Sequence, residues 1–224
     1  MRALLAALLI LLIATPAFAS GKKPDATQSI YVAMLYEKLL GKTPGFEDWV
    51  RSSPKYAKIE LYDRPQYLKD EVEKMYDTYN LLTVTEPIVL DVNAKITSYS
   101  PLGKGFLVQN FNDMTYFNYT YMGQRYALIP NGVASYQWLK CPPELAASIA
   151  REMNPDNNTV RLTLTLTPQG ADPNPIQMDG RTYKLVMAEI SKIELWSKDN
   201  SFVVWDTQFN STDVKTKSLL NLHP

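Results

Sequence analysis

The feature that most constrains the fold of this chain is a change in the spacing of its apolar residues near Val84. Upstream of Val84, apolar residues recur every three or four positions, which is the repeat of a helix with one buried face. Downstream, apolar and polar residues alternate, which is the repeat of a strand with one buried face. Helices grouped first and strands later, without regular strand–helix–strand alternation, predict an α+β fold with a mostly antiparallel, twisted sheet.

Three helices are expected before the change. The first covers residues 27–40 and is followed by Gly41, which suits the position just past a helix end. The second begins at residues 43–44, where Thr and Pro resemble an N-cap and a first helical residue. Its inward face is formed by Phe46, Trp49 and Val50.

The third helix carries the strongest pattern. Asp63 and Gln66 stand three residues apart, as in a capping box, and the helix is expected to reach about Leu82. One face of this helix is apolar and should pack inward. Its members are Leu68, Val72, Met75, Tyr76 and Tyr79.

Strands and one further helix are expected after Val84. The alternation predicts strands over residues 88–97, 103–111, 114–121, 124–129, 160–167, 181–197 and 201–207. A helix over 142–153 is inserted among them. Leucines at 162, 164 and 166 should face inward and threonines at 163, 165 and 167 outward, which leaves one sheet face partly wet.

Two irregularities are expected in the second part of the chain. The apolar parity of the 181–197 strand slips between Ile190 and Ile193, which predicts a β-bulge at residues 191–192. Residues 168–180 are rich in proline and are expected to form a loop.

The first 19 residues have the pattern of a cleavable secretory signal peptide. Arg2 is followed by an apolar run over residues 3–13, and small residues at 17 and 19 precede the expected cleavage before Ser20. The run is shorter than the roughly 20 apolar residues that span a bilayer. We therefore expect a flexible leader over 20–26 and a single α+β domain over 27–224, with a helical lobe at 27–82 and a β-rich part at 83–224.

Several function classes are excluded by composition. Lys and Arg together number 23, as do Asp and Glu, so no basic surface for nucleic acid is expected. No stretch after the leader is long and apolar enough to span a membrane. The only histidine, His223, is next to the C-terminus, and there is one cysteine, so neither a zinc site nor any other metal or cofactor site is expected.

Cysteine usage favours a bacterial periplasm, with secretion as the alternative. A lone Cys141 cannot form an intrachain disulfide, whereas secreted eukaryotic domains often carry them. Three Asn-x-Ser/Thr matches, at Asn118, Asn157 and Asn210, are too short a pattern to outweigh this.

Carboxylate chemistry stays open in principle, since two carboxyls facing a cleft can hydrolyse a glycosidic bond. The candidates are Asp63, Asp91, Asp172 and Glu189. Each has a structural interpretation as well: a helix cap for Asp63, the polar face of a strand for Asp91, a turn for Asp172 and an ion pair across the sheet for Glu189.

The predicted hairpin over 114–129 concentrates aromatic residues. Phe117, Tyr119 and Tyr121 share one face of its first strand, and Tyr116, Asn118 and Thr120 share the other. Exposed aromatics on a rigid sheet can stack on a sugar ring or anchor a protein, whereas cross-strand aromatic pairs can also simply stabilise the sheet. The candidate binding residues are Tyr116, Asn118, Tyr119 and Tyr121.

Cys141 precedes a predicted helix, where the positive end of the helix dipole favours the thiolate. The alternative is that a lone thiol is a small buried apolar group.

The function expected from these features is that of a non-enzymatic, exported module that binds a protein or an envelope component. The alternatives are a carboxylate-dependent hydrolase acting on envelope polysaccharide and a structural or assembly protein. No cofactor is expected in any of the three.

Overall fold

The computed structural model describes residues 24–207, and the structural statements below concern that part of the chain. Its first part is helical, as expected. The helices are α1 (Pro24–Leu39), α2 (Phe46–Arg51), α3 (Pro54–Ala57) and α4 (Arg64–Leu81). Helix α1 begins three residues earlier than the sequence pattern predicts, and the short α3 was not predicted.

The second part is built from strands, with α5 (Pro143–Glu152) and a short 3-10 helix, η1 (Val133–Tyr136), inserted. The strands are β1 (Ile88–Lys95), β2 (Gly105–Leu107), β3 (Phe117–Tyr121), β4 (Gln124–Asn131), β5 (Trp138–Lys140), β6 (Thr159–Met178), β7 (Arg181–Trp196) and β8 (Val203–Asp206). Strand β5 was not predicted, and β2 is shorter than the predicted 103–111 strand. The α+β class with a mostly antiparallel sheet is confirmed.

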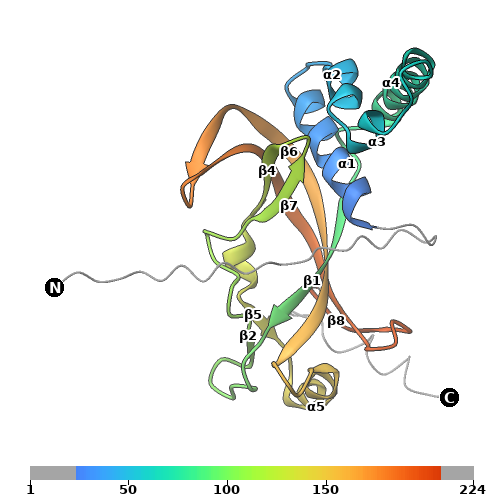
Figure 1. Ribbon diagram of the computed structural model, residues 1–224. Helices are drawn as coiled ribbons and strands as arrows, with labels where there is room; N and C mark the ends of the chain where they lie inside the picture. Colours follow the sequence, from blue (N-terminus) through green and yellow to red (C-terminus); the bar gives the residue numbers. More distant parts are fainter. Residues whose placement is uncertain (1–23, 208–224) are drawn as a thin grey trace.

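Six of the strands form one sheet in the order β1-β6-β7-β4-β3, and β8 also pairs with β7. All of its neighbours are antiparallel except β4 and β7, which are parallel. Strands β2 and β5 form a separate two-stranded sheet. Figure 1 shows the long β6–β7 hairpin curving through the whole molecule, with α1 across one end of the sheet and α5 near the other.

Residues 168–180 are not the loop that their prolines suggest. Strand β6 continues to Met178, and its pairing with β7 shifts register between Pro168 and Gly170 and again between Asp172 and Ile176. Its pairing with β1 ends at Leu166, so the proline-containing stretch is an edge. Proline is tolerated at edges and bulges because no neighbouring strand needs its missing N–H.

Two details of the strand prediction are confirmed. Lys192 pairs with Thr165 and Ile190 with Leu166, so one residue is left over at Ser191, where the bulge was expected. The leucines at 162, 164 and 166 are fully buried. On the opposite face the prediction is wrong for Thr163, which is buried as well.

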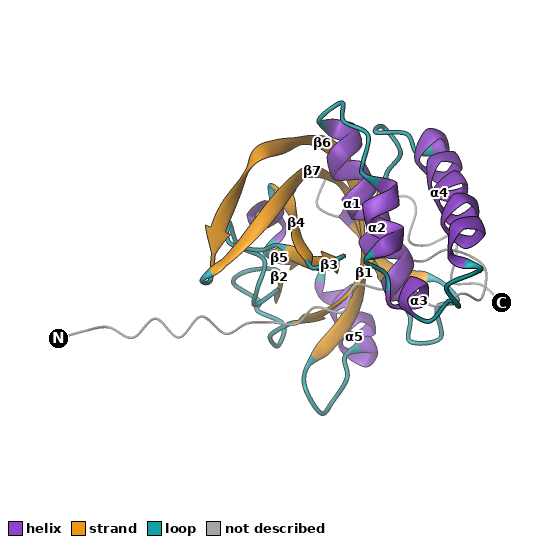
Figure 2. Cartoon of the chain, turned by 45° about the horizontal axis from the view of Figure 1, so that its top comes forward, coloured by secondary structure: helices purple, strands orange, loops and turns teal. Residues whose placement is uncertain are grey.

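The main core lies between the inner face of the large sheet and the elements that cover it. Helix α1 contributes five consecutive buried residues, Val32 to Tyr36, over the β3–β4–β7–β6 end. At the other end, Phe106 and Leu139 of the small sheet and Ile149 of α5 join the same cluster. Figure 2 shows α1 lying over the strands, with α5 separated from it along the sheet.

The helix starts differ from the predicted ones. Asp63 precedes α4 but makes no side-chain cap, because its backbone is already helical, at φ −88° and ψ −13°, whereas a capping residue needs an extended backbone. Gln66 donates to Asp70 instead of reaching back. Gly45, not Thr43, precedes α2, and Phe46 is its first residue.

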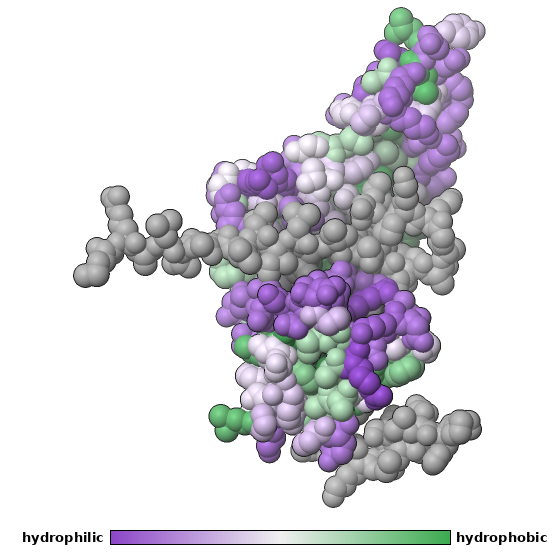
Figure 3. All heavy atoms as spheres, turned by 60° about the horizontal axis from the view of Figure 1, so that its bottom comes forward, coloured by the Kyte–Doolittle hydropathy of each residue, from purple (hydrophilic) through white to green (hydrophobic). Residues whose placement is uncertain are grey.

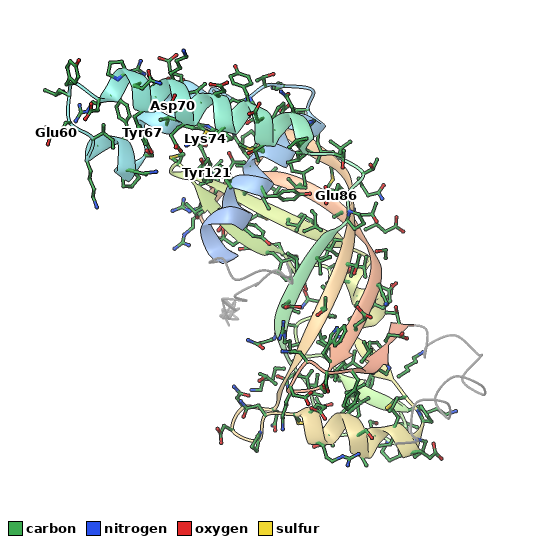
Figure 4. The ribbon with its side chains drawn as sticks, turned by 90° about the vertical axis from the view of Figure 1, so that its right-hand side faces the viewer. Glu60, Tyr67, Asp70, Lys74, Glu86 and Tyr121 are labelled. Atoms are coloured by element: carbon green, nitrogen blue, oxygen red, sulfur yellow. The ribbon has the colours of Figure 1, made fainter. Side chains whose placement is uncertain are left out.

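Helices α2, α3 and α4 form an arm that projects from the body, with the α3–α4 connection at its free end. Figure 4 shows Glu60 at this end, and Tyr67, Asp70 and Lys74 along α4. Leu61 and Tyr62 are 76% and 94% exposed there, and Figure 3 shows apolar spheres at the end of the projection. None of the described helices is long and apolar enough to cross a membrane.

Candidate functional site

The aromatic residues of β3 divide between two faces in the way the alternation predicts. Phe117 and Tyr119 are buried, and Asn118 and Thr120 are exposed. Tyr119 is only 6% exposed, so its ring belongs to the core and offers no face for stacking on a ligand. Of the four candidate binding residues, this one is placed wrongly as a surface contact, because its side of β3 faces the covered side of the sheet.

The other two tyrosines of the candidate set are half-buried and engaged within the protein. The hydroxyl of Tyr116 donates to Asp179 Oδ2 at 2.8 Å, and its ring meets Tyr183 edge-on at 5.7 Å. Tyr121 packs edge-on against Trp49 at 4.9 Å, and burial raises the pKa of its hydroxyl to about 12. Contact of Tyr116 and Asn118 with a partner stays a prediction.

Of the four candidate carboxylates, one is exposed and two accept local hydrogen bonds. Asp63 is exposed beside α4. Asp172 accepts the N–H of Asn174 at 2.8 Å in a turn within β6. Glu189 is exposed on β7 and accepts a 3.3 Å hydrogen bond from the side chain of Gln169, so the expected ion pair across the sheet does not form.

Asp91 differs from them because it is buried, at 3% exposure, although its parity in β1 predicts a polar face. Its cross-strand neighbour Thr163 donates to Oδ1 at 2.5 Å, and the Arg161 guanidinium binds Oδ2. Arg161 also donates to Asn200 Oδ1 at 2.7 Å. Both carboxylate oxygens of Asp91 are therefore occupied by partners within the protein, and Asp91 positions Arg161.

A cleft of about 420 Å³ opens beside this ion pair. Four elements supply its walls: β1, the end of α5, the start of β6 and the end of β7. The side chains that give it its chemistry are Asn93, Glu152, Asn154, Arg161 and Trp196.

The walls of the cleft are held by hydrogen bonds between elements. Glu152 Oε2 accepts the N–H of Lys198 at 2.8 Å, and Lys198 Nζ donates to the carbonyl of Arg151 at 2.6 Å. These bonds join the end of α5 to the end of β7. The adjoining turn is rigid as well, because Ser197 and Ser201 donate to Asp199 and hold the pKa of its carboxyl at about 2. The cleft is therefore preformed.

The sequence patterns did not predict this site, although the position of Trp196 in β7 is one feature that points to it. Trp196 shares its parity on β7 with Lys192 and Glu194, whereas the buried Ile193 and Leu195 have the opposite parity. A large aromatic ring in a polar row is the pattern of a contact residue. The residues that join it come from positions as distant as Asn93, and no local pattern connects them.

The remaining chemistry of the described residues is sparse. No group of three or more His, Cys, Asp or Glu in the described part of the chain could hold a metal ion. Cys141 is 5% exposed, and burial raises the pKa of its thiol to about 11, so the reactive-thiolate alternative is wrong.

Comparisons with known proteins leave the site to be interpreted from its own chemistry. No protein-family model, no curated protein and no solved structure matches this chain.

Proposed function

We propose that this protein is a non-enzymatic binding module that acts outside the cytoplasm and holds a hydroxyl-rich ligand, an envelope polysaccharide, in the cleft beside Trp196. The observation that carries the proposal is one half-buried indole in a cleft whose lining also includes two amides, two hydroxyls, a carboxylate and two cationic residues. An indole face packs against the C–H face of a sugar ring. Amide and guanidinium groups around it can hydrogen-bond the hydroxyls.

Rigid placement of these groups supports binding. Asn93 and Arg161 stand opposite one another in the β1–β6 pairing, so their spacing is set by the ladder. Arg161 is additionally fixed by Asp91 and Asn200. Groups that are already ordered lose little conformational entropy when a ligand arrives, which favours affinity.

The arrangement of carboxylates favours binding over hydrolysis. Glycosidases of the common kind need two carboxyl groups, one on each side of the bond that breaks. Among the described residues that line the cleft, Glu152 is the only carboxylate, and one of its oxygens is already taken by the Lys198 N–H. The nearby carboxylate of Asp91 is engaged in an ion pair with Arg161.

The test is a titration of the purified protein with soluble glycan strands released from peptidoglycan, followed by calorimetry. Trp196→Ala should weaken binding about tenfold or more, which corresponds to about 1.4 kcal/mol. Phe202→Ala is the matched control, since Phe202 is an exposed aromatic, at 57%, that does not line the cleft. Its affinity should equal that of the unaltered protein.

Three results would contradict the proposal. The unaltered protein could fail to bind the strands, or Trp196→Ala could bind as tightly as Phe202→Ala. Release of new reducing ends from the strands during the titration would instead establish the hydrolase alternative.

A further inference from the structure

Two hairpin turns lie at the end of the sheet remote from the Trp196 cleft. One joins β3 to β4 through Met122 and Gly123, and the other joins β6 to β7 through Asp179 and Gly180. All four residues have positive φ, at 47° and 72° in the first turn and 50° and 71° in the second, as two-residue type I′ turns require. Because β4 and β7 are parallel neighbours, both turns lie at the same end.

The two turns border a cavity of about 330 Å³. Three cationic residues line it: Arg125 at the start of β4, and Arg181 and Lys184 at the start of β7. Lys184 is paired with Glu37 at 3.1 Å. Within residues 24–207, the side chains of Arg125 and Arg181 have no hydrogen-bond or ion-pair partner, and none of the residues lining the cavity is acidic.

The cavity is built on fixed parts of the molecule. Tyr183, which is buried, lies beneath it, and the Tyr116 hydroxyl binds Asp179 in the β6–β7 turn. The same hydrogen bond ties the residue before β3 to the β6–β7 turn. Figure 1 shows the tip of the β6–β7 hairpin at the edge of the body, away from α5.

We infer that this cavity is a second binding site, which takes a phosphate or carboxylate group of a small soluble ligand between Arg125 and Arg181. Guanidinium groups match oxyanions because each can donate two parallel hydrogen bonds. Two positive charges in a concave site whose described lining holds no acidic residue also raise the local concentration of an anion.

The inferred site is independent of the proposed function. Lys184 and Trp196 both lie on β7, twelve residues apart, which is about 40 Å along an extended strand. Failure of one site to bind therefore says nothing about the other.

The experiment is isothermal titration of the purified chain with inorganic phosphate and, separately, with citrate, at low and high salt. The Arg125→Gln/Arg181→Gln double variant should bind at least about tenfold more weakly. Binding to the unaltered protein should weaken as salt rises, because the contacts are charged. Arg151→Gln is the matched control: Arg151 is an exposed arginine on α5, and its variant should bind as the unaltered protein does.

Both arginines are exposed, so the double variant should keep its melting temperature, and the single variants serve if it does not. A preference for phosphate or for citrate identifies the oxyanion. Absence of binding to both anions, or equal losses in the double variant and Arg151→Gln, would overturn the inference. Binding to phosphatidylglycerol vesicles without binding to either soluble anion would also overturn it, since the ligand would then be a membrane surface.

Discussion

At the scale of single residues, the buried tyrosines show how the core handles polar atoms. The hydroxyl of Tyr36 donates to the carbonyl of Asp172 at 2.9 Å, and that of Tyr79 to the carbonyl of Lys42 at 2.7 Å. The hydroxyl of Tyr119 is buried and, within the described residues, has no partner. A buried hydroxyl without a hydrogen bond costs the free energy of its lost hydration.

Tyr119→Phe should therefore leave the free energy of unfolding unchanged or raise it by up to about 1 kcal/mol, because the variant removes a polar atom that gains nothing in the core. Tyr36→Phe should lower it by about 1 kcal/mol, since a carbonyl loses its donor. Urea denaturation of the two variants measures both. A larger loss in Tyr119→Phe than in Tyr36→Phe would show that the Tyr119 hydroxyl has a partner in the folded protein.

The thiol of Cys141 leads to a pH-dependent prediction. Burial raises its pKa to about 11 from an ordinary value near 9, so the folded protein keeps the thiol neutral at pH 8 and largely neutral at pH 10. Modification by a thiol reagent at pH 8 should be about 100-fold or more slower in the native protein than in denaturant, because it waits for local opening. Comparable rates in the two conditions would contradict the burial of Cys141.

At the scale of secondary-structure elements, β6 explains how one strand serves two environments. Its first half pairs with both β1 and β7, and alternate residues there are leucines that enter the core. Its second half pairs with β7 alone and contains Pro168, Pro173 and Pro175. The change from central strand to edge strand at Leu166 is what makes the prolines acceptable.

The two faces of central β6 can be tested by three substitutions. Leu164→Ala should lower the free energy of unfolding by about 2–5 kcal/mol, as expected for a buried large-to-small change. Thr163→Ala should cost about 1–3 kcal/mol, because buried Asp91 loses a hydrogen-bond donor. Thr165→Ala should change it by less than about 0.5 kcal/mol.

Thermal and urea unfolding of the three variants provide the measurement. From the alternation alone, Thr163 and Thr165 are equivalent, so a difference between them reports the Asp91 contact. Equal small effects at both positions would mean that the outer face of the sheet is uniformly wet and that the Asp91 contact contributes no stability.

At the scale of the whole molecule, the curved β6–β7 hairpin joins two regions that differ in chemistry. The Trp196 cleft lies at one end, under α5, and the arginine cavity lies at the other, beside the turns. The core between them is one continuous cluster that extends from α1 to α5. The arginine cavity lies against a second, smaller cluster of Ala127, Tyr183 and Leu185.

Export belongs to the proposed function and rests on a pattern outside the described residues. If the first 19 residues act as a signal peptide, mass spectrometry of the protein recovered from the producing bacterium should find Ser20 as its N-terminus. Conversion of the apolar run to a charged one, by Leu9→Arg, should leave the uncleaved chain in the cytoplasm. An intact Met1 on protein recovered from the periplasm would contradict cleavage.

The sequence by itself determined the features that depend on neighbouring residues. The change of period at Val84 predicts the α+β class, and the leucine parity of β6 predicts which residues are buried. The slip in apolar parity predicts the bulge at Ser191. These predictions hold because repeats of 3.6 and 2 residues are properties of the backbone geometry of one element.

Only the tertiary structure decided which elements meet. Thr163 and Arg161 bury Asp91 from 70 or more positions away, and the parallel pairing of β4 with β7 brings two distant turns together. The residues of both cavities come from separate strands in the same way. Periodicity in a single strand indicates which face is buried, but it carries no information about the neighbouring strand. The burial of a polar residue and the formation of a site both depend on that neighbour.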